Sequence, residues 1–298
     1  MNTKSLRFKI VDAFYIAMMI LPIVFGIVLQ VLTDPATEGI TITGAKIFFE
    51  IPMPLQNFII TESQVNSVIA LMVIFFFCLF ITHGLSEKIE LKRQHFAELI
   101  VEKVDGLVDE NMGSYFSAYS PFIIAIMALS AVSSLLSLFG LFPPTSDINI
   151  VAGWAILVFI LITYYKMKCG PLYYIKAFTE PVAFLTPLNV IGEIATPISM
   201  AFRHYGNVLS GSVISALLCS ALGGLSASIL GWLPGFLADM PLLQVGIPAV
   251  LSIYLDVFSG LLQAFIFAML TMLYIAGGFP AEEYEKRKAR KKRVENKN

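Results

Sequence analysis

Charged residues are scarce in this chain of 298 residues, where Asp, Glu, Lys and Arg together make up only 14%. Soluble domains carry roughly 25% of these residues. Hydrophobic residues reach 57%, and a soluble protein of this size cannot bury so much apolar surface. The net charge of −1 also excludes a strongly basic nucleic-acid-binding protein. We therefore expect an all-α polytopic membrane protein.

Cysteine and histidine are equally scarce, with three of each. The cysteines are far apart, and no two of them have the spacing of metal ligands. The histidines form no HxxxH pair. The sequence also shows no nucleophile–base arrangement of an enzyme. We therefore expect no metal, no cofactor, no nucleic-acid partner and no catalytic site.

Long hydrophobic runs are what the chain has in abundance. About 20 helical residues cross a hydrocarbon core of roughly 30 Å, and segments inside lipid must be helical. Six candidate spans cover residues 13–32, 65–81, 121–142, 150–165, 187–230 and 245–276. The first run could instead be a signal peptide. It is longer than a signal core of 7–15 residues, and no small-x-small cleavage site follows it, so we favour a retained span.

The cations predict the orientation of the spans. Eighteen of the 20 Lys and Arg residues lie before the first run or after the second, fourth and last runs. Six spans place these four segments on one side, which the positive-inside rule makes cytoplasmic. We therefore expect both termini in the cytoplasm of a bacterial cell and the spans in its plasma (inner) membrane. The loops on the opposite side contain one cation, Lys46. The remaining cation, Arg203, lies inside a span.

Three segments lie outside the spans. Residues 84–117 are charged, with apolar residues at helical spacing, so we expect an amphipathic helix that lies at the membrane interface or packs on a partner subunit. Residues 33–64 are expected to form an external loop. The basic tail 279–298 is expected to be solvated or to contact anionic lipid.

Arg203 is the most informative residue. A central Arg costs roughly 2.5–3.5 kcal/mol on membrane-insertion scales and stays ionised, so an intramembrane Arg indicates a functional site. Helical spacing places it on one polar face of the 187–230 span; the other residues on that face are Thr196, Ser199, Asn207 and Ser210. A structural ion pair with an acid on another helix is the alternative.

A second polar stripe occupies the last span, and its members are Ser252, Asp256, Ser259, Gly260 and Gln263. With the predicted orientation, Glu193 lies toward the cytoplasm from Arg203, and Asp256 lies outward of Gln263. Polar groups thus flank Arg203 on both sides of the membrane in two offset sets. This pattern favours two half-length aqueous paths separated by a fixed positive charge.

Three motifs carry a resemblance to a known family. Residues 197–211, PISMAFRHYGNVLSG, are similar to P-x-S-x-x-x-R-L-F-G-N-x-x-A-G; residues 262–267, LQAFIF, match L-Q-A-F-I-F; and residues 144–149, PTSDIN, match P-T-x-D-x-N. In this order they resemble subunit a of the rotary F-type ATP synthase, of the bacterial type. The resemblance covers residues 62–278. It leaves out residues 1–61, with the additional span and the external loop, and the tail at 279–298. We expect the additional span to pack on the outside of the helix bundle or on a stalk subunit.

The resemblance implies a non-catalytic Fo subunit with two long tilted C-terminal helices forming a hairpin beside the c-subunit ring. Its other partners are the subunit b stalk, the rest of the F1Fo complex and membrane lipid. Protons, or sodium ions in some members, enter one half-channel, ride on ring carboxylates and leave by the other. Arg203 matches the essential arginine of the family, and Asn207 and Gln263 match polar residues near it. A secondary ion-coupled transporter is the alternative, but the inverted repeats of that class are not evident.

Three positions depart from the family pattern. Ser212 stands where many bacterial members have Glu, and Asp256 stands where many have His. His204 follows the arginine where Leu is usual. The outer half-channel is therefore expected to be built differently, with Asp256 as its main ion-handling group and with Ser210, Ser212 and His204 as further candidates. Glu193 is the candidate on the inner side.

Overall fold

The structure, a computed structural model, describes residues 3–33, 44–54, 57–85, 92–179, 182–230, 243, 246, 250–251 and 253–295. Its longer helices are α1 (Thr3–Thr33), α2 (Glu62–Thr82), α3 (Lys92–Met112), α4 (Ser120–Leu135), α5 (Ile148–Lys166), α6 (Pro171–Thr179), α7 (Thr186–Leu230), α9 (Ser259–Gly278) and α10 (Ala281–Glu295). Short helical turns join them at η1 (Ser114–Tyr119), η2 (Leu136–Phe139), η3 (Pro144–Ser146), η4 (Met167–Cys169) and η5 (Ala183–Leu185). The π-helical segment η7 (Ile253–Phe258) precedes α9.

Six helical segments of the described chain are long and apolar enough to cross a membrane, which confirms the prediction of an all-α polytopic membrane protein. They lie at Phe8–Thr33, Glu62–Thr82, Ser114–Phe139, Ile148–Cys169, Thr186–Leu230 and Ile253–Gly278. The external loop contains an element that the sequence reading missed. Strands β1 (Ile47–Ile51) and β2 (Phe58–Thr61) pair antiparallel, in keeping with their β-branched and aromatic residues.

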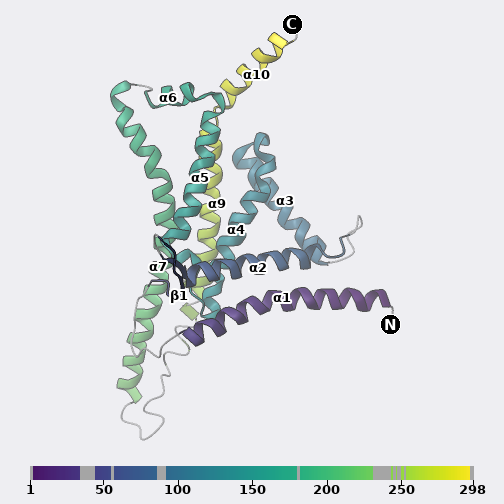
Figure 1. The fold of residues 1–298 in the computed structure, drawn as a ribbon, viewed down its shortest axis with the longest axis vertical. Coiled ribbons are helices and arrows are strands. Elements are labelled where there is room, and N and C mark those ends of the chain that lie inside the picture. Colours follow the sequence, from purple (N-terminus) through teal and green to yellow (C-terminus); the bar gives the residue numbers. More distant parts are fainter. Residues whose placement is uncertain are drawn as a thin grey trace.

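Two sets of helices run in different directions. Figure 1 shows α1 and α2 side by side, crossing the direction of α5, α7 and α9 steeply. No single bilayer normal can be parallel to both sets, so at least one of them is tilted in the membrane. The additional helix α1 lies along α2, where a Cβ built on Gly26 comes within 2.6 Å of Ile69 Cδ1. In the N-terminal half of α1, Asp12 accepts a hydrogen bond of 2.8 Å from Arg93 of α3.

The charged segment 84–117 differs from its prediction. It is not one helix to residue 117, because α3 ends at Met112 and Gly113 adopts φ +80°, a conformation that side-chain-bearing residues rarely take. Part of the apolar side of α3 packs within this chain. Val104, Val108 and Met112 are buried within this chain, where α3 contacts α4 and α9.

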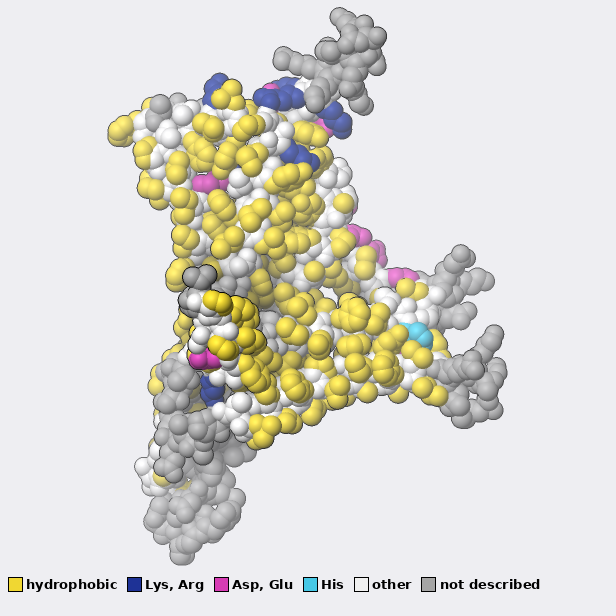
Figure 2. All heavy atoms as spheres, viewed as in Figure 1, with side chains coloured by type: hydrophobic (Ala, Val, Ile, Leu, Met, Phe, Trp, Pro, Cys, Tyr) yellow, Lys and Arg dark blue, Asp and Glu magenta, His cyan; other side chains and the backbone are white. Residues whose placement is uncertain are grey.

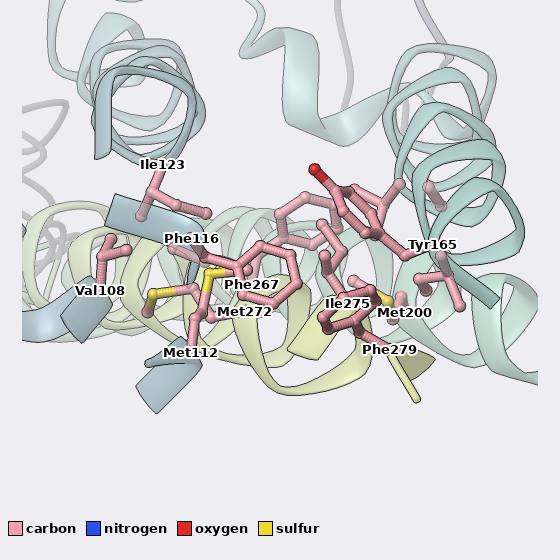
Figure 3. Close-up of a cluster of buried hydrophobic side chains, with 14 of the residues drawn as sticks. Val108, Met112, Phe116, Ile123, Tyr165, Met200, Phe267, Met272, Ile275 and Phe279 are labelled. Atoms are coloured by element: carbon pink, nitrogen blue, oxygen red, sulfur yellow. The ribbon is translucent and has the colours of Figure 1, made fainter. Parts of the chain in front are cut away.

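The main hydrophobic core surrounds α9. Figure 3 shows Phe267, Met272 and Ile275 of α9 packed among side chains from α3, η1, α4, α5 and α7. In contrast, α7 contributes only four buried residues among those described, namely Met200, Ala201, His204 and Ser226. The longest helix therefore lies at the edge of the bundle and presents most of its length outward.

Hydrophobic side chains cover most of the face of the molecule seen in Figure 2. Lys and Arg side chains gather at the end of the bundle where α6 and the start of α10 lie. An apolar band with cations at one end is the distribution expected of a protein embedded in lipid.

Candidate functional site

Arg203 lies on the exposed side of α7. Its apolar neighbours point the same way, since Phe202 and Ile198 are 61% and 51% exposed. Arg203 forms no hydrogen bond or ion pair with any residue that the structure describes. The structural ion pair considered from the sequence is therefore not found within that part of the chain. An ionised guanidinium on the exposed face of a membrane-spanning helix calls for an anionic partner beyond those described residues.

Asn207 and Gln263 connect the two polar stripes. The Asn207 amide nitrogen donates a hydrogen bond of 2.7 Å to Gln263 Oε1, which joins α7 to α9. Gln263 is buried and Asn207 is exposed, so the pair runs from the interior of the bundle to the face that carries Arg203. Ser210 and Ser212 are also exposed, but their hydroxyls bond carbonyls of α7 itself, those of Gly206 and Leu209.

Glu193 lies in the wall of a cavity rather than near Arg203. The cavity has a volume of about 530 Å³ and is lined by residues from α5, α6, the first turns of α7 and the end of α9. A second cavity of about 220 Å³ shares Lys166, Glu193 and Thr196 with it, so the two adjoin. Lys166 donates to both carboxylate oxygens of Glu193, at 2.8 and 2.6 Å.

Other groups complete this polar wall. The Tyr174 hydroxyl donates to Glu193 at 3.5 Å, and burial, followed by the Glu193 carboxylate, raises the pKa of Tyr174, which stays neutral. One turn along α7, Pro197 has no amide hydrogen to donate to the Glu193 carbonyl. The α-helical hydrogen bond to that carbonyl is therefore missing. The arrangement can hold water and a small cation beside a carboxylate.

His204 points into the bundle, opposite to Arg203. It is fully buried, its Nε2 lies 3.2 Å from Ser130 Oγ on α4, and its ring packs edge-on against Trp154 and Phe267. Successive helical residues are about 100° apart, which explains how adjacent side chains serve opposite sides of α7. His204 was a candidate from the sequence, but the sequence did not indicate that its side chain points into the bundle.

Asp256 belongs to the π-helical segment η7, and its side chain lies outside what the structure describes, as does Ser252. The prediction that these residues share a face with Gln263 assumed α-helical spacing. A π-helical turn is wider, so that spacing does not carry across residues 253–258. The segment does lie against α7, because a Cβ built on Gly211 comes within 3.9 Å of Leu255 Cβ.

Two groups of polar residues were missed from the sequence. Lys166 was counted only as a cytoplasmic charge, although it pairs with Glu193. Ser130, Ser133 and Ser134 lie buried in an apolar run. Their i, i+3, i+4 spacing is a polar helical face, and that signal was available.

Comparison with known proteins shows which family the chain resembles. Residues 65–276 match the family described as ATP synthase A chain. The chain is 28% identical over 283 residues to "ATP synthase subunit a, sodium ion specific" of Propionigenium modestum, covering 85% of this chain and 89% of that one. It is 32% identical over 231 residues to ATP synthase subunit a of Priestia megaterium, covering 73% and 92%. From the motifs, the membrane-spanning helices and this match, the chain belongs to the ATP synthase subunit a family.

Proposed function

We propose that this chain is the ion-translocating subunit of the Fo sector of a rotary ATP synthase, with Arg203 as the residue that meets the carboxylates of the c-subunit ring. Its complex is F1Fo, and the ring and the subunit b stalk are its neighbours in the membrane. It couples ion flow to ring rotation, while ATP chemistry takes place on other subunits. Membership of the subunit a family supports this role over that of a secondary transporter.

The observation that carries the proposal is the exposed Arg203, which has no ion-pair partner among the residues that the structure describes. The neighbouring groups on that face of α7, such as Asn207 and Ser210, are uncharged, so a lipid neighbour leaves the charge of Arg203 without compensation. A ring carboxylate supplies that compensation, and the Arg lowers the pKa of an incoming carboxyl so that it releases its ion. Each carboxylate then moves on, because the next one takes its place beside the fixed charge.

The inner half-channel is proposed to use the cavity beside Glu193. This cavity lies at the end of the bundle with α6 and α10, where the Lys and Arg side chains gather, and we assign that end to the cytoplasm. Thr196 lines both adjoining cavities and lies two turns before Arg203 on the same helical face. An ion released near Arg203 therefore has a polar route toward Glu193.

The outer half-channel is proposed to approach Arg203 from the opposite end of α7. Asp256, Ser210 and Ser212 belong to this side, with Asp256 as the main ion-handling group. The Asn207–Gln263 pair provides a polar connection between α9 and the ring-facing side of α7. The transported ion is H⁺ or Na⁺, and one relative is named as sodium ion specific.

The test uses Arg203→Ala in the assembled complex in inside-out membrane vesicles. We expect ATP-driven ion uptake to be lost, while ATP hydrolysis by the F1 sector survives. Ile198→Ala, at another exposed position of α7, is the control, and we expect it to retain uptake. Normal uptake by Arg203→Ala in an assembled complex refutes the proposal.

A further inference from the structure

The C-terminal helix α10 lies outside the part of the chain that the family match covers. The match ends at residue 276, whereas α10 begins at Ala281. Residues 286–293, KRKARKKR, contain seven cations among eight residues, and we name them the basic segment. The proposed ion route uses none of these residues, so the basic segment calls for a different role.

Like charges are crowded on the basic segment. Residues three and four apart are neighbours on a helix surface, and two charges of one sign at that spacing destabilise the helix. Glu283 and Glu285 balance only the first cations, at 3.2 Å from Arg287 and 3.9 Å from Lys288. A helix with this pattern is stabilised when anions from outside the chain neutralise it. The i, i+4 pairs in which both residues are cations are Lys286 with Arg290, Arg287 with Lys291, and Lys288 with Lys292.

The first turns of α10 are held against the bundle. Arg287 donates a hydrogen bond to the Cys169 carbonyl of η4, and its guanidinium carbon lies 5.6 Å from the centre of the Tyr173 ring of α6. The rings of Tyr284 and Phe279 lie 5.3 Å apart, centre to centre. The basic segment therefore starts from a defined place and extends away from the bundle (Figure 1).

Tyrosine rings surround the base of α10. Lys168 Nζ lies 5.0–5.7 Å from the centres of four rings, those of Tyr115, Tyr164, Tyr165 and Tyr284. It also donates a hydrogen bond of 2.7 Å to the Tyr115 hydroxyl. Tyrosine is enriched where the hydrocarbon of a bilayer meets its headgroups, and Lys side chains at helix ends reach toward that layer. This group of rings therefore indicates the level of the membrane interface.

The short helix α6 indicates the same level. It lies across the end of the bundle (Figure 1), and its Leu172 and Ile175 side chains are 81% and 60% exposed. Phe184, which follows in η5, is 87% exposed. Lys176 lies in the last turn of α6. Exposed apolar side chains beside a cation are typical of a helix in the membrane interface, where acyl chains cover the apolar groups.

These positions bring the basic segment to the headgroups. At 1.5 Å per residue, the segment begins about 8 Å and ends about 18 Å from the start of α10. The headgroup layer of one leaflet is about 5–8 Å thick, and its charges act over a further Debye length of about 8 Å. Most of the segment thus lies within reach of headgroup charges even if α10 stands upright on the bilayer.

We propose that α10 docks on anionic phospholipid headgroups of the cytoplasmic leaflet, with α6 inserted beside it as an apolar anchor. The tyrosine rings and the exposed side chains of α6 favour lipid over an acidic protein segment, because they place the basic segment at the bilayer surface. Clusters of about four to eight cations directly after a membrane span attract acidic lipid. The proposal uses the proposed orientation of the chain but not the role of Arg203.

A spin label at residue 289 tests the docking of α10 in the assembled complex. Ala289 is exposed and lies within the basic segment. The label is attached to Ala289→Cys, with Cys78→Ser and Cys219→Ser removing the two native cysteines that are not buried. The complex is placed in vesicles of phosphatidylcholine alone or mixed with phosphatidylglycerol. We expect phosphatidylglycerol to reduce collisions of the label with an uncharged, water-soluble nickel complex severalfold, and salt at about 1 M, where the Debye length is about 3 Å, to restore them.

Two further variants make this measurement specific. A label on Asp109→Cys of α3 is the matched control, because Asp109 is exposed and lies beside Glu110, so we expect no effect of phosphatidylglycerol there. In the Ala289→Cys chain, Gln at positions 290–293 should abolish the effect. This change also removes like-charge pairs, so it does not weaken the helix.

Two outcomes at residue 289 overturn the docking of α10. Collisions that are frequent in both kinds of vesicle mean that water surrounds the helix. Collisions that are rare in phosphatidylcholine alone and do not respond to phosphatidylglycerol or salt mean that a protein partner covers it.

A label on Leu172→Cys tests the insertion of α6. We expect frequent collisions with oxygen, which dissolves among acyl chains, and rare collisions with the nickel complex. Rare collisions with both reagents mean that protein covers α6, and frequent collisions with nickel mean that water does; either result overturns the anchor. Ion uptake by Arg203→Ala decides the proposed function separately, since no label measurement depends on it.

Discussion

Replacing Glu193 by Gln tests whether this carboxylate handles ions or only neutralises Lys166. The two side chains face each other across the cavity wall, with Lys166 Nζ 2.6 Å from Glu193 Oε2. Gln keeps the size and one acceptor oxygen but removes the charge. The variant therefore leaves the Lys166 ammonium in the wall without its counter-ion.

The distance between the two charges determines how strongly Lys166 and Glu193 attract each other. Two unit charges 2.6 Å apart attract by about 6 kcal/mol at an effective dielectric constant of about 20. The side chains of Lys166 and Glu193 keep 28% and 16% of their exposure, so water screens the pair, and desolvation offsets part of the attraction. We expect a measured coupling energy of about 2 kcal/mol, within the range for contacting residues.

Three variants separate charge balance from ion handling, namely Glu193→Gln, Lys166→Gln and the double variant. Thermal stability of the solubilised complex reports the charge balance. We expect each single variant to be less stable and the double variant to recover most of the loss, because it leaves no charge unpaired. ATP-driven ion uptake reports whether ions pass along the proposed inner half-channel. We expect uptake to fall about tenfold in both variants that lack Glu193, matching roughly 1.4 kcal/mol of barrier.

The decisive comparison is the uptake of the double variant. If uptake returns with stability, Glu193 serves only as the partner of Lys166, and the inner path does not depend on its carboxylate. If stability shows no coupling between the two substitutions, the ion pair itself contributes nothing measurable and the calculation above is wrong.

Three further outcomes follow from single contacts. Gly260→Val forces a side chain against Ser134 Cβ, 2.6 Å from an ideal Cβ, so we expect a loss of about 1–3 kcal/mol, seen as a lower melting temperature; an unchanged melting temperature contradicts that contact. Asp12→Asn weakens the 2.8 Å bond to Arg93 and should lower stability by about 1–2 kcal/mol without changing ion uptake per assembled complex. Asn207→Leu removes the amide that bonds α9 and should slow uptake about tenfold, or roughly 1.4 kcal/mol; wild-type uptake argues against a role for that amide.

The number of the spans and their positions along the sequence were predictable because lipid allows few solutions. Every long apolar run had to be helical, and six such segments are present in the described chain. The details outside lipid were harder. The strand pair at 47–61 depends on local β-propensity and pairing, and the end of α3 depends on a single glycine with positive φ. Neither feature produces a long periodic pattern.

The candidate site was predictable where one residue carried a large energetic penalty. Arg203 stood out because no apolar environment tolerates it without compensation. The partners of less costly residues were not predictable. Lys166 pairs with Glu193 across two helices that are adjacent only in the folded chain, and no spacing rule connects them. The inward direction of His204 likewise depends on which side of α7 meets α4.

The positions of Glu193 and His204 on α7 support the separation of the two proposed half-channels. The Glu193 carboxylate and His204 lie about 16 Å apart along α7 at 1.5 Å per residue. His204 is buried on the interior side of α7, whereas Arg203 is exposed on another side. An ion that passes directly between the routes must go by the fixed guanidinium, whose charge repels it. A ring carboxylate instead carries the ion as a neutral pair, which makes rotation the lower-energy path.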